Sequence, residues 1–390
     1  VEIGRINSEN QTINVTREEI KLPDLPYFGM VTQDVGYVKL SSFSQTAFQS
    51  VQTAFKSLRG EGMQTAILDL RDNGGGLLME AIRIVNLFVP KGQDVVATKG
   101  RLLAENRSYK TTEKATYPEM KLVVLINERS ASASEIVAGS LQDLDRAVVI
   151  GAQSYGKGLV QRTFDLKYGS KLKLTISKYY TPSGRCVQRL EYYNKNSDEK
   201  PEEISDTLLT VFKTRNGRDV IDGRGVVPDI EIKKESLTRL TTLLLLQDMV
   251  FHFATQYAAK EDSIASPEDF TLDAGTYQEF IAFVIENKDF TYETGTEIKL
   301  KELKEQAIEE GYLDLIQTSY DLIERSVSAN LEREMASIKE EISRWIESEI
   351  ISRYYFQSGM SRHGFRFDLD MIKALDVLEN EQEYKNILKL

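Results

Sequence analysis

The chain has 390 residues, of which 41% are hydrophobic and 28% charged, and its formal net charge at pH 7 is −11. This length is enough for two or three domains with cores of their own, and the negative charge argues against a general nucleic-acid binder, which needs a basic face. No apolar run is long enough to span a bilayer. The single cysteine, Cys186, excludes an internal disulfide and a cysteine zinc site.

The first residues predict the end of a domain. Residues 1–5 and 12–16 have the pattern of two short strands, and two strands alone bury too little apolar surface to be stable. A proline-containing stretch, residues 22–26, predicts a linker. Because the chain opens inside a strand-like run, we expect a trimmed chain whose export signal could lie upstream.

Apolar strand patterns and helical patterns then alternate along the chain. Short apolar runs predict strands at residues 36–40, 65–70, 95–98, 122–126 and 147–150. Helix-like segments lie between them at residues 43–58, 77–88 and 136–142. This alternation is typical of βαβ units, so we predict an α/β fold with a mostly parallel sheet and helices on both faces.

Small residues form the corner between the strand at 122–126 and the helix after it. Ser132 and Glu135 fit the S-x-x-E pattern of a helix capping box. A serine at this place would also lie beside backbone N–H groups that have no partner inside the helix, and such groups can bind the oxyanion of a tetrahedral intermediate. On this stretch alone the cap is the favoured interpretation, because a nucleophile needs a base.

Three consecutive glycines, residues 74–76, follow the strand at 65–70. Their spacing is not that of a phosphate-binding loop. They indicate either a tight turn that needs positive φ or a turn whose amides donate hydrogen bonds into a site. Because this corner and the Ser132 corner both lie at the carboxyl ends of their strands, where open α/β sheets bind ligands, the two could face one crevice.

Two histidines, His252 and His363, bear on the choice of a base. Both lie far from Ser132, in a region with helical patterns, and neither has metal-ligand spacing. We expect His252 to be a packed or half-buried neighbour of aromatic residues and His363 to lie in a loop. A Ser-His-Asp triad is therefore disfavoured, and lysine is the usual substitute base.

Lys157 lies between two glycines and ahead of apolar residues. It is either a solvated loop charge or a base whose ordinary pKa of ~10.4 is lowered by burial to about 7–8. Ser154 and Lys157 also match S-x-x-K, the signature of β-lactamases and penicillin-binding proteins. That motif needs a helix, which the glycines disfavour, so we interpret the match as chance.

The remaining chain adds a hairpin, a polar excursion and a helical region. Residues 160–181 alternate as a hairpin, and residues 191–224 are polar. From residue 236 on, apolar residues recur at spacings of three and four. This pattern predicts an α-helical domain that packs on itself, with a dimer seam or a lid as the less favoured alternatives.

Six segments together carry a resemblance to a known family. They are residues 36–43, 67–78, 127–143, 151–161, 179–185 and 223–229. With these segments in this order, and with Ser132 and Lys157 twenty-five residues apart, the chain resembles the C-terminal processing, or tail-specific, serine proteases, which use a serine–lysine dyad. The resemblance covers roughly residues 30–235 and implies a ClpP/crotonase-like protease core.

The resemblance also implies a division into domains. It places the last strands of a truncated PDZ domain at residues 1–23, the protease core at 24–235 and a helical C-terminal domain at 236–390. The PDZ loop that binds a substrate carboxylate would lie upstream of this sequence. One departure, Arg129 where many members have glycine, removes no catalytic group.

The resemblance assigns roles to residues of this chain. It makes Ser132 the nucleophile, Lys157 the general base and Gln161 a residue that orients the lysine. The supporting groups are an assisting carboxylate and backbone oxyanion donors: Glu135, Ala133, Gly75 and, as a further candidate, Gly74. Such a dyad needs no metal and no cofactor.

The activity implied is that of an endopeptidase that forms an acyl-enzyme. Its substrates would be unfolded polypeptides or polypeptides with exposed C-terminal tails, and its place the periplasm or cell envelope. We expect no nucleic-acid partner and no transmembrane segment in this chain. The sequence leaves open whether the chain forms a homo-oligomer. The alternatives are a non-proteolytic ligand-binding protein on the same fold, which would lack the serine or the lysine, and a scaffold whose dyad is not assembled.

Overall fold

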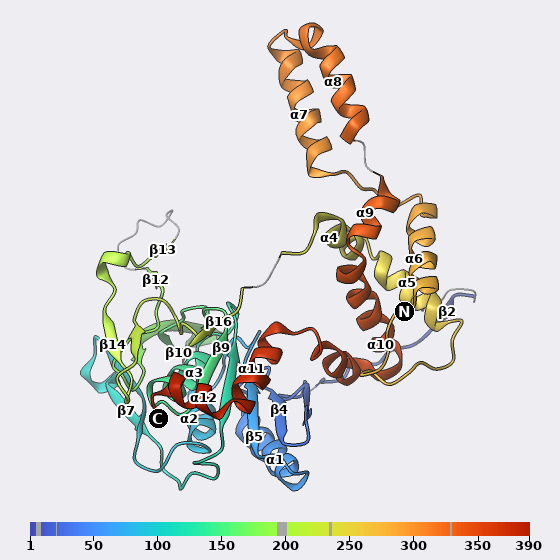
Figure 1. The fold of residues 1–390 in the computed structure, drawn as a ribbon. Coiled ribbons are helices and arrows are strands. Elements are labelled where there is room, and N and C mark those ends of the chain that lie inside the picture. The colour runs from blue at the N-terminus through green and yellow to red at the C-terminus, as the bar shows by residue number, and fades with distance from the viewer. Residues whose placement is uncertain (5–8, 21, 193–200, 234–235, 328–329) are drawn as a thin grey trace. The chain divides into compact units, whose positions relative to one another are not determined.

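The computed structural model describes the chain except for residues 5–8, 21, 193–200, 234–235 and 328–329. The described residues form two compact units (Figure 1). The first, the α/β unit, comprises Glu19–Lys233 and Phe367–Leu390, and the second, the helical unit, comprises Val1–Glu18 and Lys234–Arg366. Each unit has a hydrophobic core of its own.

The α/β unit is built on a six-stranded sheet with the strand order β16-β9-β8-β5-β4-β3. Neighbouring strands from β16 to β4 are parallel, and β3 is antiparallel to β4. All residues of β5, β8 and β9 are buried, as parallel strands covered on both faces require. These observations confirm the predicted α/β fold. The strands are β3 (Tyr27–Met30), β4 (Val35–Lys39), β5 (Thr65–Asp69), β8 (Leu122–Ile126), β9 (Val148–Gly151) and β16 (Ile230–Glu231).

Helices cover both faces of this sheet. Leu68 and Val124 belong to the core that α1, α2 and α3 complete, whereas Ile67 and Val123, one residue away, are buried on the opposite face. The C-terminal helices α11 and α12 contact β8 and β9 and cover that opposite face. The helices are α1 (Ala47–Gly60), α2 (Leu78–Asn86), α3 (Ala133–Asp143), α11 (Leu369–Glu379) and α12 (Glu381–Leu388).

The packing of α11 and α12 differs from the sequence expectation of one helical domain over residues 236–390, since both helices belong to the α/β unit. Arg71, which follows β5, forms an ion pair of 2.7 Å with Asp370 in α11. The Tyr384 hydroxyl in α12 accepts a hydrogen bond of 3.1 Å from a backbone amide of β8. Helical periodicity shows that a segment has an apolar face but not which surface covers that face, so the pattern could not reveal this division.

A four-stranded antiparallel sheet, in the order β10-β11-β6-β7, belongs to the same unit. β10 and β11 form the hairpin predicted for residues 160–181. The described part of the polar excursion contains two small ribbons, β12 with β13 and β14 with β15. The elements are β6 (Asp94–Gly100), β7 (Arg107–Lys110), β10 (Leu159–Asp165), β11 (Lys171–Tyr180), β12 (Leu190–Glu191), β13 (Glu202–Glu203), β14 (Val211–Lys213), β15 (Asp219–Ile221) and the 3-10 helices η1 (Leu103–Glu105), η2 (Lys167–Gly169) and η3 (Asp206–Leu208).

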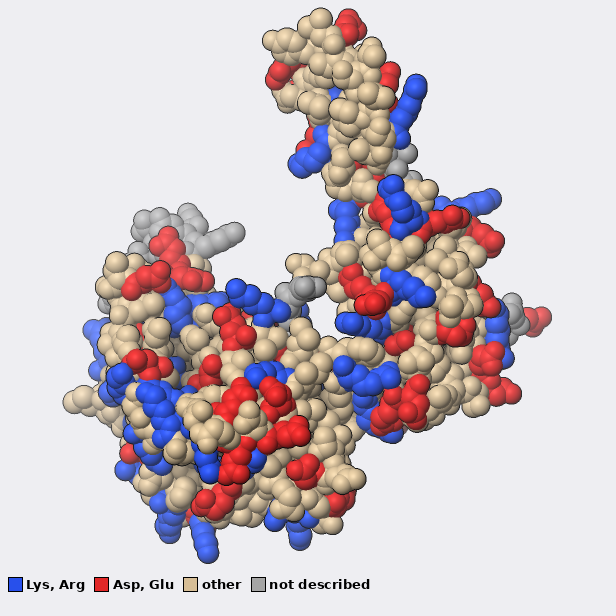
Figure 2. All heavy atoms as spheres, in the orientation of Figure 1, with Lys and Arg blue, Asp and Glu red and all other residues tan. Residues whose placement is uncertain are grey.

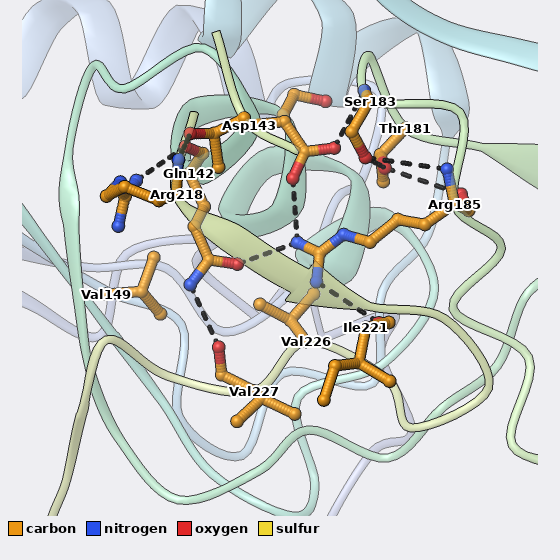
Figure 3. Close-up of polar contacts among 12 residues, drawn as sticks. Gln142, Asp143, Val149, Thr181, Ser183, Arg185, Arg218, Ile221, Val226 and Val227 are labelled. Carbon is orange, nitrogen blue, oxygen red and sulfur yellow. Dashed lines mark hydrogen bonds and ion pairs between the residues drawn. The ribbon is translucent and has the colours of Figure 1, made fainter. Parts of the chain in front are cut away.

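A cluster of buried charges joins the C-terminal end of α3 to Arg185 and to Arg218 of the polar excursion (Figure 3). Arg185 is fully buried, and its guanidinium lies 2.9 Å from Asp143 Oδ1 and donates a hydrogen bond of 2.7 Å to Gln142 Oε1. Arg218 lies 2.6 Å from Asp145 and donates a hydrogen bond of 2.8 Å to the backbone carbonyl of Gln142. Buried charges are tolerated when they are paired and hydrogen-bonded, so the cluster ties this end of α3 to the loops around it.

The helical unit packs its helices around a core of aromatic and aliphatic side chains. Phe253 in α5 and Phe280 in α6 lie 5.1 Å apart between ring centroids, and Ile346 of α10 is buried in the same core. Helices α7 and α8 lie side by side (Figure 1). None of the described helices is both long and apolar enough to cross a membrane. The elements are β1 (Glu2–Ile3), β2 (Gln11–Thr12), α4 (Arg239–Leu246), α5 (Met249–Ala258), α6 (Ala274–Glu286), α7 (Gly295–Glu309), α8 (Leu313–Val327), α9 (Leu331–Ser337) and α10 (Lys339–Gly364).

His363 lies in a helix and not in a loop, and His252 contacts an aromatic ring as expected but is more exposed than predicted. His363 is buried in α10, with Nε2 3.2 Å from Glu347 Oε2, because α10 runs on to Gly364. His252 is exposed on α5, where its ring contacts Phe251. Both belong to the helical unit, whereas Ser132 belongs to the α/β unit.

Candidate active site

Ser132 stands at the turn between β8 and α3. Its φ is 58°, which is uncommon for a residue other than glycine and persists only where the surrounding structure supports it. The support comes from Asn73, whose backbone carbonyl accepts hydrogen bonds from the Ala131 amide at 3.0 Å and the Ser134 hydroxyl at 2.8 Å. The serine turn is therefore held on both sides of Ser132.

Gly75 brings the turn formed by residues 74–76, the glycine turn, against the turn at Ser132, the serine turn. Its φ is 99°, and a Cβ atom at this position would lie 2.6 Å from the Ala131 carbonyl oxygen and 2.7 Å from Ser132 Cβ. Glycine is required here because it permits both the positive φ and the close approach. The structure thus brings together the two corners that the order of strands and helices suggests would share a crevice.

The backbone amides around this contact are not equivalent. The Ala133 amide, at the first position of α3, and the Gly74 amide have no acceptor among the described residues. The Gly75 amide donates a hydrogen bond of 2.9 Å to Asn73 Oδ1. Sequence resemblance places Gly75 ahead of Gly74 as an oxyanion donor, whereas in this structure the amides of Ala133 and Gly74 are the ones left unpaired.

Glu135 joins the serine turn to the loop that carries Lys157. Its buried Oε2 accepts hydrogen bonds from the Ser132 amide at 2.9 Å and the Lys157 amide at 2.8 Å. Its Oε1 accepts from the Gly156 amide at 2.7 Å and the Ser154 hydroxyl at 2.6 Å. Burial raises the pKa of Glu135 above its ordinary value, and the hydrogen bonds oppose that rise. Because two amides share one oxygen, the backbones of Ser132 and Lys157 are adjacent.

Lys157 lies half-buried in the loop between β9 and β10. The neighbouring Gly158 amide donates a hydrogen bond of 2.8 Å to Gln188 Oε1, which also holds the loop in place. The Lys157 amine makes no hydrogen bond or ion pair with any other described residue, Ser132 included. Gln161 is exposed on β10, and within the described residues its side chain has no hydrogen bond to Lys157.

Tyr179 belongs to the site, although the sequence alone indicates no role for it. It is buried in β11, and its hydroxyl donates a hydrogen bond to the Lys157 carbonyl. Burial, reinforced by the charge of Glu135, raises the pKa of Tyr179 well above its ordinary value. Strand alternation could have placed this side chain inside the unit, but not against the backbone of Lys157.

Ser154 supports Glu135 from a loop. Its hydroxyl donates to Glu135 Oε1 and accepts a hydrogen bond of 2.7 Å from the Val226 amide. Residues 152–158 contain no helix, so Ser154 and Lys157 do not occupy successive turns of one. The S-x-x-K spacing is therefore a chance match, as interpreted from the glycines.

A pocket with a volume of about 1200 Å³ opens beside these groups. Gly74, Ala131, Lys157 and Gln161 all line it, so it connects the glycine turn, the serine turn and the lysine loop. Within the described part of the chain, no group of three or more His, Cys, Asp or Glu residues is arranged to hold a metal ion. The arrangement is that of a site built from a hydroxyl, an amine and free backbone amides.

Comparison with known proteins agrees with this arrangement. Residues 34–192 match the model described as peptidase family S41. This segment of the α/β unit is therefore similar to peptidase family S41. A second match, to the C-terminal helical domain of a probable PDZ-protease, covers residues 240–378. The S41 match contains both Ser132 and Lys157.

Curated proteins similar to this chain include named processing proteases. It is 41% identical over 180 residues to a carboxy-terminal-processing protease of Bartonella bacilliformis, covering 45% of this chain and 41% of the relative. It is 40% identical over 169 residues to a carboxyl-terminal-processing protease of Synechocystis, covering 43% and 39%. The chain thus spans about two fifths of the length of these relatives. A solved photosystem II D1 C-terminal processing protease is 26% identical, with a TM-score of 0.42 and coverage of 59% of this chain and 53% of that one.

Proposed function

We propose that this chain is a serine endopeptidase whose nucleophile is Ser132 and whose general base is Lys157. The observation that carries the proposal is the shared carboxylate oxygen: Glu135 Oε2 binds the amides of Ser132 and Lys157 together. A nucleophile and its base must be held within hydrogen-bond reach of each other by groups that do not react. Glu135 meets this requirement through the backbone, and the similarity of residues 34–192 to peptidase family S41 supports the same assignment.

The reaction begins with proton transfer from Ser132 Oγ to the neutral amine of Lys157. As the proton leaves, Oγ attacks the peptide carbonyl, and the oxyanion that forms accepts hydrogen bonds from the free amides of Ala133 and Gly74. The protonated amine then gives its proton to the leaving peptide nitrogen, which leaves an acyl-enzyme. Lys157, neutral again, activates the water that hydrolyses the ester. Gln161, at the wall of the same pocket, orients the amine in this proposal.

A rotamer change of Lys157 completes the dyad. The amine has no partner among the described residues, so turning it toward Ser132 breaks none of their hydrogen bonds. A bound peptide would exclude water from the pocket around the two side chains. The alternative, a scaffold or ligand-binding protein on the same fold, requires that the amine never reach Ser132 even when a peptide is bound.

The substrates we propose are polypeptides that are unfolded or have exposed C-terminal tails, in the periplasm or cell envelope. The relatives named as carboxy-terminal-processing proteases support the tail preference. The assignment of residues 1–23 to a PDZ domain stays a prediction. In the structure these residues include the short ribbon of β1 with β2, which belongs to the helical unit.

Cleavage of a denatured protein tests the proposal. The parent chain should cut it, and Ser132→Ala and Lys157→Ala should each lower kcat/KM by at least about a thousandfold. Two matched controls, Ser57→Ala on α1 and Lys173→Ala on β11, change exposed residues outside the pocket and should cut at the parent rate. Full activity of a folded Lys157→Ala variant would show that the base lies elsewhere.

A further inference from the structure

Two lysines face each other on neighbouring strands beside the candidate site. Lys99 of β6 and Lys178 of β11 are direct partners in the antiparallel register, so their side chains project from the same face of the sheet. Like charges in such positions repel each other and destabilise the pairing. An anion bound beside the two ammonium groups would relieve this repulsion.

The described residues supply no such anion. Neither lysine forms an ion pair with a described carboxylate, and the Lys99 amine lies 4.6 Å from the centroid of the Tyr180 ring. Arg101, shortly after Lys99, is exposed and also has no ion pair among the described residues. All three cations line the pocket that reaches Lys157. Their charges are therefore available to a ligand in that pocket.

The positive charge is local to the pocket. Its described lining contains five cations and one carboxylate: Lys99, Arg101, Arg129, Lys157, Lys178 and Glu191. The chain as a whole carries a net charge of −11, and Figure 2 shows acidic and basic side chains interspersed over the face that it draws. A concave surface lined by charges of one sign concentrates the field and attracts the opposite charge.

Apolar side chains form most of the remaining wall. Tyr155, Leu159 and Ile176 line the same pocket as Lys157 and the paired lysines. Such a wall accommodates the apolar part of a peptide, and a small number of polar groups at one end fixes its orientation. Because Gly74 and Ala131 line the same pocket, a peptide whose carbonyl reached the serine turn would extend along this wall.

We propose that Lys99, Lys178 and Arg101 form a subsite for a carboxylate of the polypeptide substrate. The inference rests on the proposed endopeptidase function and adds to it a preference for a negative charge a few residues from the cleaved bond. Ammonium and guanidinium groups are the protein groups that pair with carboxylates most strongly. Two sources have this chemistry: the α-carboxylate at the end of a tail, and an Asp or Glu side chain within the chain.

Peptide binding to a Ser132→Ala chain tests the subsite without cleavage. Fluorescence anisotropy would compare peptides of one apolar sequence that end in a free carboxylate or an amide, and peptides that carry Glu or Gln at one internal position. The carboxylate form should bind about three- to tenfold more tightly at low salt, and the difference should shrink as salt is added. The pair of peptides that shows the difference, either the two C-terminal forms or the internal Glu and Gln forms, identifies the source of the carboxylate.

Charge variants in the same Ser132→Ala background tie the preference to these residues. Lys99→Gln with Lys178→Gln should abolish it, and Lys178→Glu should do the same because a glutamate there would pair with Lys99. Lys173→Gln, an exposed change on the same strand but outside the pocket, should leave it intact. Lys99→Arg with Lys178→Arg keeps the charge and should keep the preference.

Two results would overturn the inference: equal binding of the acid and amide forms in both pairs of peptides, or a preference that persists in folded Lys99→Gln with Lys178→Gln. Folding of each variant is checked by circular dichroism. Because binding is measured on a chain that lacks the nucleophile, a lysine-dependent preference would stand even if the parent chain proved not to cleave. Cleavage without that preference would uphold the endopeptidase and reject the subsite.

Discussion

Glu135 is the residue on which the serine and lysine turns depend together. Its side chain touches no substrate atom in the proposed mechanism, so it acts as a positioning residue. The groups around it all act as donors toward it: three backbone amides and the Ser154 hydroxyl. Only a carboxylate offers acceptors in every direction that these donors require.

Glu135→Gln should therefore lower activity without unfolding the chain. The glutamine amide nitrogen is a donor, so it would face donors and leave at least one buried amide unpaired, at a cost of about 1–3 kcal/mol. We expect kcat to fall about 10- to 100-fold with KM nearly unchanged. Glu128→Gln, at an exposed position of the same turn, is the control. If a folded Glu135→Gln chain kept the parent kcat, Glu135 would have no positioning role in the site.

A substitution at Gly75 tests whether cleavage needs the close packing of the glycine turn against the serine turn. Gly75→Ala would place a methyl group against the Ala131 carbonyl at a φ of 99°. We expect it to lower the free energy of unfolding by about 2–4 kcal/mol, through backbone strain and overpacking, and to abolish cleavage. Gly92→Ala is the matched control, because Gly92 has a φ of 89° and open space around its Cβ position. It should cost only about 1 kcal/mol and leave cleavage unchanged. Equal effects of the two changes would contradict this account.

At the scale of elements, the end of β5 is tied to the start of α11. Arg71 lies between Asp69 of β5 and Asp370 of α11 and pairs with both at 2.7 Å. Burial raises the pKa of Asp69, but the charge and hydrogen bonds of Arg71 outweigh it and hold this pKa below its ordinary value. The glycine turn follows directly, so this buried network forms the base of the candidate site.

The network predicts a loss of stability in acid. A carboxyl whose pKa is lower in the folded than in the unfolded state stabilises the fold above its unfolded pKa of ~3.9, and that contribution disappears as pH falls through the folded pKa. Denaturant titrations between pH 7 and pH 3 should show Asp69→Asn less stable than the parent at pH 7, with the difference shrinking below about pH 4. Asp94→Asn, at an exposed surface pair, should change stability by less than about 1 kcal/mol throughout. A constant Asp69→Asn difference across this range would contradict the account.

At the scale of the molecule, the α/β unit is discontinuous in sequence. Residues 19–233 supply its sheets, and α11 and α12 return to cover β8 and β9 after the whole helical unit has been traversed. A chain that ends at residue 233 would leave that face of the sheet uncovered. Large exposed apolar patches cause aggregation.

A shortened chain tests this organisation. Residues 19–233 joined to residues 367–390 by a flexible Gly/Ser linker should be soluble and unfold cooperatively, because both parts belong to one compact unit. Residues 19–233 alone should aggregate or bind a hydrophobic dye. Thermal unfolding and size-exclusion chromatography distinguish the two outcomes. A stable, monomeric 19–233 fragment would show that α11 and α12 are dispensable for the unit.

Much of the fold and part of the site followed from local patterns. The apolar runs predicted β4, β5, β8 and β9, and helical spacing predicted α1 and α2, because strand and helix periodicity depend on neighbouring residues alone. The resemblance to C-terminal processing proteases predicted Ser132 and Lys157 as the reacting pair. Asn73, Tyr179 and the Lys99–Lys178 pair gave no signal, because their roles depend on partners far away in the chain.

The sequence by itself therefore determined the class of fold, a resemblance to a protease family and the residue types that could react. Only the tertiary structure decided which amides stay free, that one carboxylate oxygen holds the serine and lysine turns together, and that the last two helices belong to the α/β unit. The physical reason is one of range. Periodicity and turn chemistry act over a few residues, whereas burial and hydrogen-bond pairing depend on which distant segments meet, and that is settled when the whole chain packs.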